Sequence, residues 1–134
     1  LLVAPDTEAE QWVKEVAAVN GMPYIVCNKT RKGDSHVEVE LPLTDIRGRH
    51  LYIVDDVIST GNTIAKTASL LLEMGASQVS VLCTHSLFAS GAQELLQRSG
   101  VHEIISTNSI SHSTNRIDLS PLLARNIKGL LQEM

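Results

Sequence analysis

Short apolar runs alternate along the chain with longer segments in which apolar residues recur every three or four positions. The short runs predict strands at residues 1–4, 24–27, 51–54, 79–83 and 103–106. The longer segments between and after them predict helices. This alternation predicts an α/β fold with a mainly parallel sheet and helices on both of its faces. In such sheets ligands bind at the carboxyl ends of the strands.

The predicted helices carry start and stop signals of their own. Thr7 with Glu10 has capping-box spacing, and so does Ser90 with Gln93. Gly21 should end the first helix. A second helix is predicted from about residue 63 to 74, and Ser120-Pro121 predicts the start of the last. The inward-facing residues are expected to be Trp12, Val13, Val16 and Ala17 in the first helix, Ile64, Ala68, Leu71 and Leu72 in the second, and Leu123, Ile127, Leu130 and Leu131 in the last.

One stretch between the second and third predicted strands is polar. Residues 28–35 are mostly polar or charged, which predicts a mobile loop. Residues 37–41 alternate apolar and acidic side chains, which predicts a half-exposed edge strand.

Composition and charge exclude several classes of protein. The 134 residues fit a single domain, with 43% apolar and 19% charged residues. A net charge of −4 gives no electrostatic reason to expect nucleic acid as a partner, and no apolar run is long enough to span a membrane. Cys27 and Cys83 lie in apolar stretches, which predicts buried, reduced thiols in a cytoplasmic protein.

The first residues bear on domain organisation. The run from Leu1 to Ala4 resembles a buried strand with no lead-in, and no initiator Met precedes it. We therefore expect residues 1–134 to be one domain of a longer parent chain whose upstream half is absent.

One segment concentrates polar chemistry after a predicted strand. Residues 51–63 run from that strand through two carboxylates into a turn rich in Gly and hydroxyl groups, and then into a helix. Backbone amides at the positive end of the helix form an anion cradle, and Gly61 lets the backbone turn tightly. The carboxylates are acceptors suited to sugar hydroxyls or to a metal. The segment predicts a sugar-phosphate site made of Asp55, Asp56, Ser59, Thr60, Gly61, Asn62 and Thr63.

Each candidate group also has a plainer interpretation. An isolated Asp-Asp pair would only cap a helix, although the whole segment favours the anion site. On their own, Lys29 and Arg31 would be charges on a solvated loop, and Asp6 would be a helix N-cap. His85 after a predicted strand is most simply structural. No G-x-x-x-x-G-K-[ST] motif occurs, which excludes a P-loop NTPase.

Residues 54–63 resemble the motif by which type I phosphoribosyltransferase folds bind phosphoribosyl pyrophosphate (PRPP). Further resemblances, in the same order along the chain, point to the ribose-phosphate diphosphokinases, also called PRPP synthetases. Residues 4–6 resemble the start of that family's pyrophosphate loop, and Lys29-Thr30-Arg31 resembles its flexible catalytic loop. Residues 84–91, 107–110 and 120–124 resemble three later motifs of the family.

The resemblance implies the C-terminal domain of such an enzyme, with a phosphoribosyltransferase-like fold. The family transfers the β,γ-diphosphoryl group of ATP to the anomeric hydroxyl of ribose 5-phosphate, giving PRPP and AMP. By resemblance, residues 59–63 bind the 5-phosphate, Asp55 and Asp56 face the ribose hydroxyls, and Lys29 and Arg31 are catalytic. Asp6 would bind the catalytic Mg²⁺ together with a His from the absent half. The parent would be a homo-oligomer that uses ATP as co-substrate, and this chain alone would be inactive.

Two other functions stay open. The sequence departs from the family at Thr7-Glu8-Ala9, where the pyrophosphate loop usually carries glycines. Glu8 would favour a non-catalytic relative that regulates a PRPP synthetase, whereas Lys29 with Arg31 argues against one. A nucleobase phosphoribosyltransferase, which consumes PRPP, would need a hood over the base, and a chain with 3% aromatic residues has little to build it from.

Overall fold

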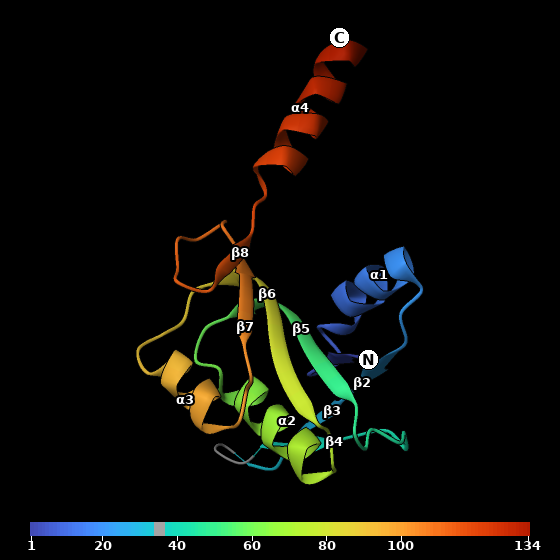
Figure 1. The fold of residues 1–134 in the computed structure, drawn as a ribbon, viewed down its shortest axis with the longest axis vertical. Helices are drawn as coiled ribbons and strands as arrows, with labels where there is room; N and C mark the ends of the chain where they lie inside the picture. Colours follow the sequence, from blue (N-terminus) through green and yellow to red (C-terminus); the bar gives the residue numbers. More distant parts are fainter. Residues whose placement is uncertain (34–36) are drawn as a thin grey trace.

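A six-stranded parallel sheet forms the centre of the molecule (Figure 1). The computed structural model describes residues 1–33 and 37–134, without the side chains of Arg31 and Val37. The strands of the sheet are β1 (Leu2–Ala4), β2 (Tyr24–Val26), β5 (His50–Ile58), β6 (Gln78–Ser86), β7 (Ile104–Thr107) and β8 (Asn115–Ile117). They lie in the order β2-β1-β5-β6-β7-β8. β3 (Asn28–Arg31) and β4 (Val37–Glu40) form a separate antiparallel ribbon.

Helices cover both faces of the sheet, which confirms the predicted fold class. α1 (Glu10–Asn20) packs on one face, where Leu2 and Ala4 belong to its cluster of buried residues. α2 (Asn62–Glu73) and α3 (Ala92–Arg98) lie on the other side (Figure 1), where Val3 belongs to the larger core. Since side chains alternate across a strand, the short β1 contributes to both cores.

The last helix stands apart from this arrangement. α4 (Ser120–Glu133) extends away from the sheet (Figure 1). It begins at Ser120 with Pro121 in its first turn, as predicted. The apolar residues expected to line it, Leu123, Ile127, Leu130 and Leu131, are exposed in this structure. None of the described helices combines the length and the apolar character needed to cross a bilayer.

The ends of the first and third helices differ from prediction. α1 begins at Glu10, after a turn in which Asp6 Oδ1 accepts the Ala9 N–H at 2.9 Å, and its N-cap has no side-chain hydrogen bond. The predicted capping box of Thr7 and Glu10 is therefore wrong. The N-cap of α3 is Gly91, so the predicted Ser90 cap is wrong too. Gly21, at a φ of 62°, does end α1 as predicted.

The predicted mobile loop at residues 28–35 is wrong over its first half. Asn28 to Arg31 form β3, in which Lys29 lies opposite Val39 and Thr30 opposite Glu38 of β4. Its side chains are all polar, so backbone pairing alone makes the strand, and no apolar pattern could indicate it. Residues 34–36 of the predicted loop lie outside the described residues. The edge strand predicted at 37–41 is confirmed as β4.

The structure also differs from the prediction in the length of β5 and in the edge strand β8. β5 continues through Asp55 and Asp56 to Ile58, because its parallel pairing with β6 extends to Ile58 opposite Ser86. The two carboxylates therefore lie within the strand instead of beyond it. β8 was not predicted, since its three residues show no apolar alternation. Its Asn115 Nδ2 donates to the Thr107 carbonyl oxygen at 2.6 Å and so ties this edge strand to β7.

Candidate functional site

The carboxyl ends of β1 and β5 are hollowed beside Asp6, which lies two residues after β1. A hollow of about 150 Å³ lies between Asp6, Asp55 and the loop of residues 59–63. A second, of about 430 Å³, adjoins it and is lined by Asp6, Asp55, Asp56 and Trp12. The structure thus brings three predicted acidic residues and the predicted phosphate loop to one place.

A third hollow brings the β3-β4 ribbon into the same site. It measures about 550 Å³ and is lined by Asp6, Thr7, Glu8 and Lys29. Lys29 Nζ donates a hydrogen bond to Thr63 Oγ1 at 3.0 Å, across the space between the ribbon and the phosphate loop. Because β3 is a paired strand, Lys29 is held over the loop by a defined element.

For Arg31, the other predicted catalytic residue, the structure describes the backbone but not the side chain. Its backbone belongs to β3 and pairs with Val37 of β4. Its side chain lies outside the described residues. Its catalytic role therefore stays a prediction.

The segment from Ser59 to Thr63 has the geometry of an anion site. Ser59 and Thr60 are exposed, and Gly61 adopts a φ of 78° at the start of α2. A side chain at Gly61 would also meet α3, since a Cβ there would lie 3.4 Å from Leu96 Cγ. The N-cap of α2 is Gly61, which has no capping side chain, and in the first turn the Asn62 N–H donates a long hydrogen bond to Thr60 Oγ1 at 3.5 Å. The amino end of α2 therefore offers amide donors to an anion.

The carboxylates of Asp6, Asp55 and Asp56 line one hollow and influence one another. Asp55 Oδ1 accepts the Asp56 N–H at 2.9 Å, and Asp56 Oδ1 accepts the Val57 N–H at 2.8 Å. Burial, followed by a hydrogen bond to the Asp56 side chain and the charges of Asp6 and Asp56, raises the pKa of Asp55 to about 7. Among the described side chains, which do not include that of Arg31, the ion pairs join Lys32 to Glu38 and Arg47 to Asp45, and none involves Asp6, Asp55 or Asp56. The site therefore has room for a cation or for hydroxyl donors.

The same burial and charge act on the two cysteines beneath the site. Burial and then the charge of Asp6 raise the pKa of Cys27 to about 12. Burial and then the charge of Asp55 raise the pKa of Cys83 to about 11. Both thiols are buried and free, which confirms that prediction and makes them unreactive near neutral pH.

Sequence reasoning missed Trp12 as a site residue and placed it in the core. The buried stripe of α1 is Ala9, Val13 and Ala17, spaced by four, and Trp12 is 41% exposed on the wall of the second hollow. Because this stripe is made of small residues at i, i+4 spacing, a stricter reading of the helical period would have left Trp12 outside it. Val16, also predicted to face inward, is exposed for the same reason.

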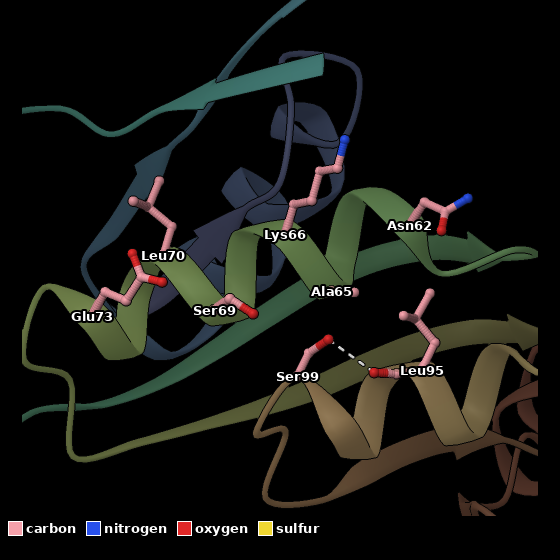
Figure 2. Close-up of a pocket in the computed structure, with 8 residues that line it drawn as sticks. All are labelled: Asn62, Ala65, Lys66, Ser69, Leu70, Glu73, Leu95 and Ser99. Atoms are coloured by element: carbon pink, nitrogen blue, oxygen red, sulfur yellow. Dashed lines mark hydrogen bonds between the residues drawn. The ribbon is translucent and has the colours of Figure 1, made fainter. Parts of the chain in front are cut away.

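A separate groove runs between α2 and α3 (Figure 2). It measures about 330 Å³ and is lined by Asn62, Ala65, Lys66, Ser69, Leu70, Glu73, Leu95 and Ser99. Among the residues that the structure describes, Asn62 is the one predicted site residue on its wall. The groove therefore lies beside the candidate site and does not form part of it.

A parallel sheet with an anion loop at its carboxyl edge, next to paired carboxylates, defines a phosphoribosyltransferase-like α/β domain. The adenine phosphoribosyltransferase of Trypanosoma brucei shares this fold, with a TM-score of 0.64 over 93% of this chain and 67% of that chain at 15% identity. The chain belongs to the family of the phosphoribosyl synthetase-associated domain, whose model matches residues 5–134. This confirms the family predicted from the sequence motifs.

Two further relatives are more similar. A ribose-phosphate pyrophosphokinase of Methanosarcina acetivorans is 35% identical over 130 residues, which cover 97% of this chain and 46% of that protein. The crystal structure of the phosphoribosylpyrophosphate synthetase of Mycobacterium smegmatis aligns with a TM-score of 0.79 at 28% identity, over 99% of this chain and 45% of that chain. The chain thus spans about half the length of the curated relatives it matches.

Proposed function

We propose that this chain is the ribose 5-phosphate-binding domain of a ribose-phosphate pyrophosphokinase. This enzyme is the same as the ribose-phosphate diphosphokinase that the sequence motifs resemble. In that role the chain helps transfer the β,γ-diphosphoryl group of ATP to ribose 5-phosphate, giving PRPP and AMP. The observation that carries the proposal is the hydrogen bond from Lys29 Nζ to Thr63 Oγ1 at 3.0 Å. It joins the predicted catalytic segment to the predicted phosphate loop. The relatives that match nearly the whole chain support the same activity.

In this proposal the phosphate loop and the carboxylates bind different parts of ribose 5-phosphate. The amides of residues 59–63, at the positive end of α2, bind the 5-phosphate. Asp55 and Asp56 accept hydrogen bonds from the ribose hydroxyls. Burial, and then the neighbouring carboxylates, raise the pKa of Asp55, and hydroxyl donors or a cation would stabilise its charged form.

Lys29 acts on the transferred group. The anomeric oxygen of ribose 5-phosphate bonds to the β-phosphorus of ATP, and the bond from that phosphorus to the oxygen bridging it to the α-phosphorus breaks. The hydroxyl releases its proton to solvent, and AMP departs with the bridging oxygen and the electron pair of the broken bond. The Lys29 ammonium stabilises the negative charge that develops on the transferred diphosphoryl oxygens. Arg31 shares this role by resemblance.

The residues present fit only part of a Mg²⁺ site. Across the described residues, no group of three or more His, Cys, Asp or Glu side chains converges on a metal position. Mg²⁺ is usually held by one or two carboxylates together with substrate phosphates, and Asp6 meets that requirement. When bound, Mg²⁺ would neutralise phosphate charge, and Asp6 would position it. A His from the other half of the parent would complete the protein ligands.

The remaining parts of the proposal concern the parent protein. We propose that the chain works with a second domain, because it spans about half of its relatives' length. Assembly of the parent into a homo-oligomer and a cytoplasmic location belong to the proposal through the family resemblance.

Calorimetric titration of this chain with ribose 5-phosphate, with and without Mg²⁺, tests the proposal directly. We expect saturable binding of ribose 5-phosphate and none of free ribose, because the phosphate loop supplies most of the contacts. Equal binding of the two sugars would contradict the assignment of residues 59–63. Binding without turnover in the full-length parent would favour the regulatory relative over the enzyme.

A further inference from the structure

The turn before α3 contains the one described non-glycine residue with a positive φ. Phe88 has a φ of 39°, in the left-handed region that bulky side chains rarely adopt. Such a conformation is sterically costly, so it persists only where surrounding contacts hold it. Here the Phe88 ring packs against the larger core and against His112, with ring centroids 4.6 Å apart. The ring thus anchors a strained backbone.

The backbone of this strained turn is bonded to the phosphate loop. The Phe88 N–H donates to the Ile58 carbonyl oxygen at 2.9 Å, and the Ala89 N–H donates to the Ser59 carbonyl oxygen at 2.8 Å. In an extended strand, successive amides point to opposite sides. The N–H groups of two consecutive residues can both bond to one partner segment only if the first of these residues departs from extended φ and ψ angles. Phe88 is that residue.

These two hydrogen bonds also orient the amides of the phosphate loop. The peptide unit is planar and trans, so the carbonyl of Ile58 and the N–H of Ser59 point in opposite directions. The carbonyl of Ser59 and the N–H of Thr60 are related in the same way. Bonding both carbonyls to the 88–89 turn therefore directs both N–H groups away from it. Within the described chain, neither N–H makes a hydrogen bond, and Ser59 and Thr60 line the smallest hollow of the site.

The geometry points to Phe88 as a positioning residue whose strained turn aims the Ser59 and Thr60 amides at a bound phosphate. Phe88 need not touch the ligand, because it acts through the backbone of residues 58 and 59. The inference rests on the proposed function for the identity of the ligand, a phosphorylated sugar. The orientation of the two amides is a property of the chain without ligand.

Two substitutions at Phe88 separate the backbone conformation from ring packing. Phe88→Ala removes the anchor but keeps the steric cost of a Cβ at positive φ, so the turn relaxes. We expect its affinity for ribose 5-phosphate and for inorganic phosphate to fall about 10-fold in calorimetric titration of the chain. Glycine adopts positive φ without cost, so Phe88→Gly should bind more tightly than Phe88→Ala, although it lacks the ring as well.

A matched control loses stability without disturbing the turn. Val79 is fully buried near the amino end of β6. The candidate site lies at the other end of the strands, their carboxyl ends. Val79→Ala should lower the melting temperature and leave phosphate affinity unchanged. The inference is overturned if Phe88→Ala binds like the wild type, or if Phe88→Gly binds no better than Phe88→Ala.

Backbone amide spectra of the ligand-free chain separate failure of this inference from failure of the proposed function. If the wild type binds neither ribose 5-phosphate nor phosphate, the proposed function fails. In that case, shifted or broadened Ser59 and Thr60 resonances in Phe88→Ala but not in Val79→Ala would support the positioning role. Unchanged resonances in Phe88→Ala would overturn it.

Discussion

The two halves of the candidate site are built in opposite ways. The phosphate loop lies between β5 and α2, and hydrogen bonds from the 88–89 turn fix the carbonyl oxygens of Ile58, at the end of β5, and Ser59, at the start of the loop. The carboxylate half, made of Asp6, Asp55 and Asp56, collects like charges, and burial together with these neighbours raises the pKa of Asp55. The first half is shaped by hydrogen bonds within this chain, whereas the second gathers three carboxylates in one place.

This difference indicates how the work of the site is divided. A loop of preset amides binds an anion with little rearrangement, which gives affinity. A cluster of uncompensated carboxylates costs stability and is useful only with a cation or hydroxyl donors in place. Changes in the loop should therefore act on binding, and changes among the carboxylates should act on both binding and stability. Lys29 bridges the halves and should act on turnover.

The largest effect is expected for Lys29→Ala in the full-length parent. Removing a cation that stabilises developing charge should lower kcat by about 10²–10³, while ribose 5-phosphate affinity stays within about threefold. Steady-state kinetics and calorimetry measure the two quantities. Lys32→Ala on the same ribbon is the control, because Lys32 forms an exposed ion pair with Glu38 and should change kcat by less than about twofold. Equal losses in both variants would mean that the ribbon's net charge matters and not Lys29 itself.

Asp56→Asn should have the next largest effect, on binding. Loss of charged acceptors for the ribose hydroxyls should weaken ribose 5-phosphate binding about 100-fold in calorimetry. The exposed Asp45, which bonds Arg47 ahead of β5, offers an isosteric control, and Asp45→Asn should leave the affinity unchanged. Wild-type affinity in Asp56→Asn would remove Asp56 from the site.

Gly61→Ala tests the loop half alone. Gly61 has a φ of 78°, so the added Cβ costs about 1 kcal/mol of unfolding free energy and shifts the loop. Gly21→Ala, at a φ of 62° and with nothing within 4 Å of the new Cβ, should lose the same stability. Denaturant unfolding should show similar losses, while only Gly61→Ala should weaken phosphate binding, by about fivefold. Equal phosphate affinities of Gly61→Ala and Gly21→Ala would mean that the geometry of the loop does not affect binding.

The smallest effect concerns the carboxylate half and pH. In the folded chain the pKa of Asp55 rises from its ordinary 3.8 to about 7, so between those values the folded state binds more protons than the unfolded state. Unfolding free energy should therefore fall as pH rises from about 4 to 7. Asp55→Asn should remove this dependence and gain about 1 kcal/mol relative to wild type at pH 8, after allowance for solvent screening. Urea unfolding in EDTA at several pH values measures it, and parallel profiles for the two proteins would contradict it.

Sequence patterns predicted the parallel sheet and the phosphate loop because both have local signatures. β5 contains a continuous apolar run at residues 51–54, and the loop pairs Gly61 with hydroxyl residues before a helix. The β3-β4 ribbon could not be predicted, since its polar strand is held by a partner rather than by burial. The strained turn at Phe88 could not be predicted from the sequence for a related reason. Its conformation comes from contacts with Ile58, Ser59 and His112, which lie far from it in the sequence.

The position of β1 has a consequence for how the molecule folds. This strand of three residues lies between β2 and β5 in the sheet and pairs Leu2 with both Tyr24 and Tyr52. The pairing of β1 is therefore complete only when β5, a strand much later in the sequence, has joined the sheet. Such non-local closure slows folding relative to helical proteins of the same size. Until β5 pairs with it, β1 exposes an unpaired apolar edge, which makes the folding chain prone to aggregate.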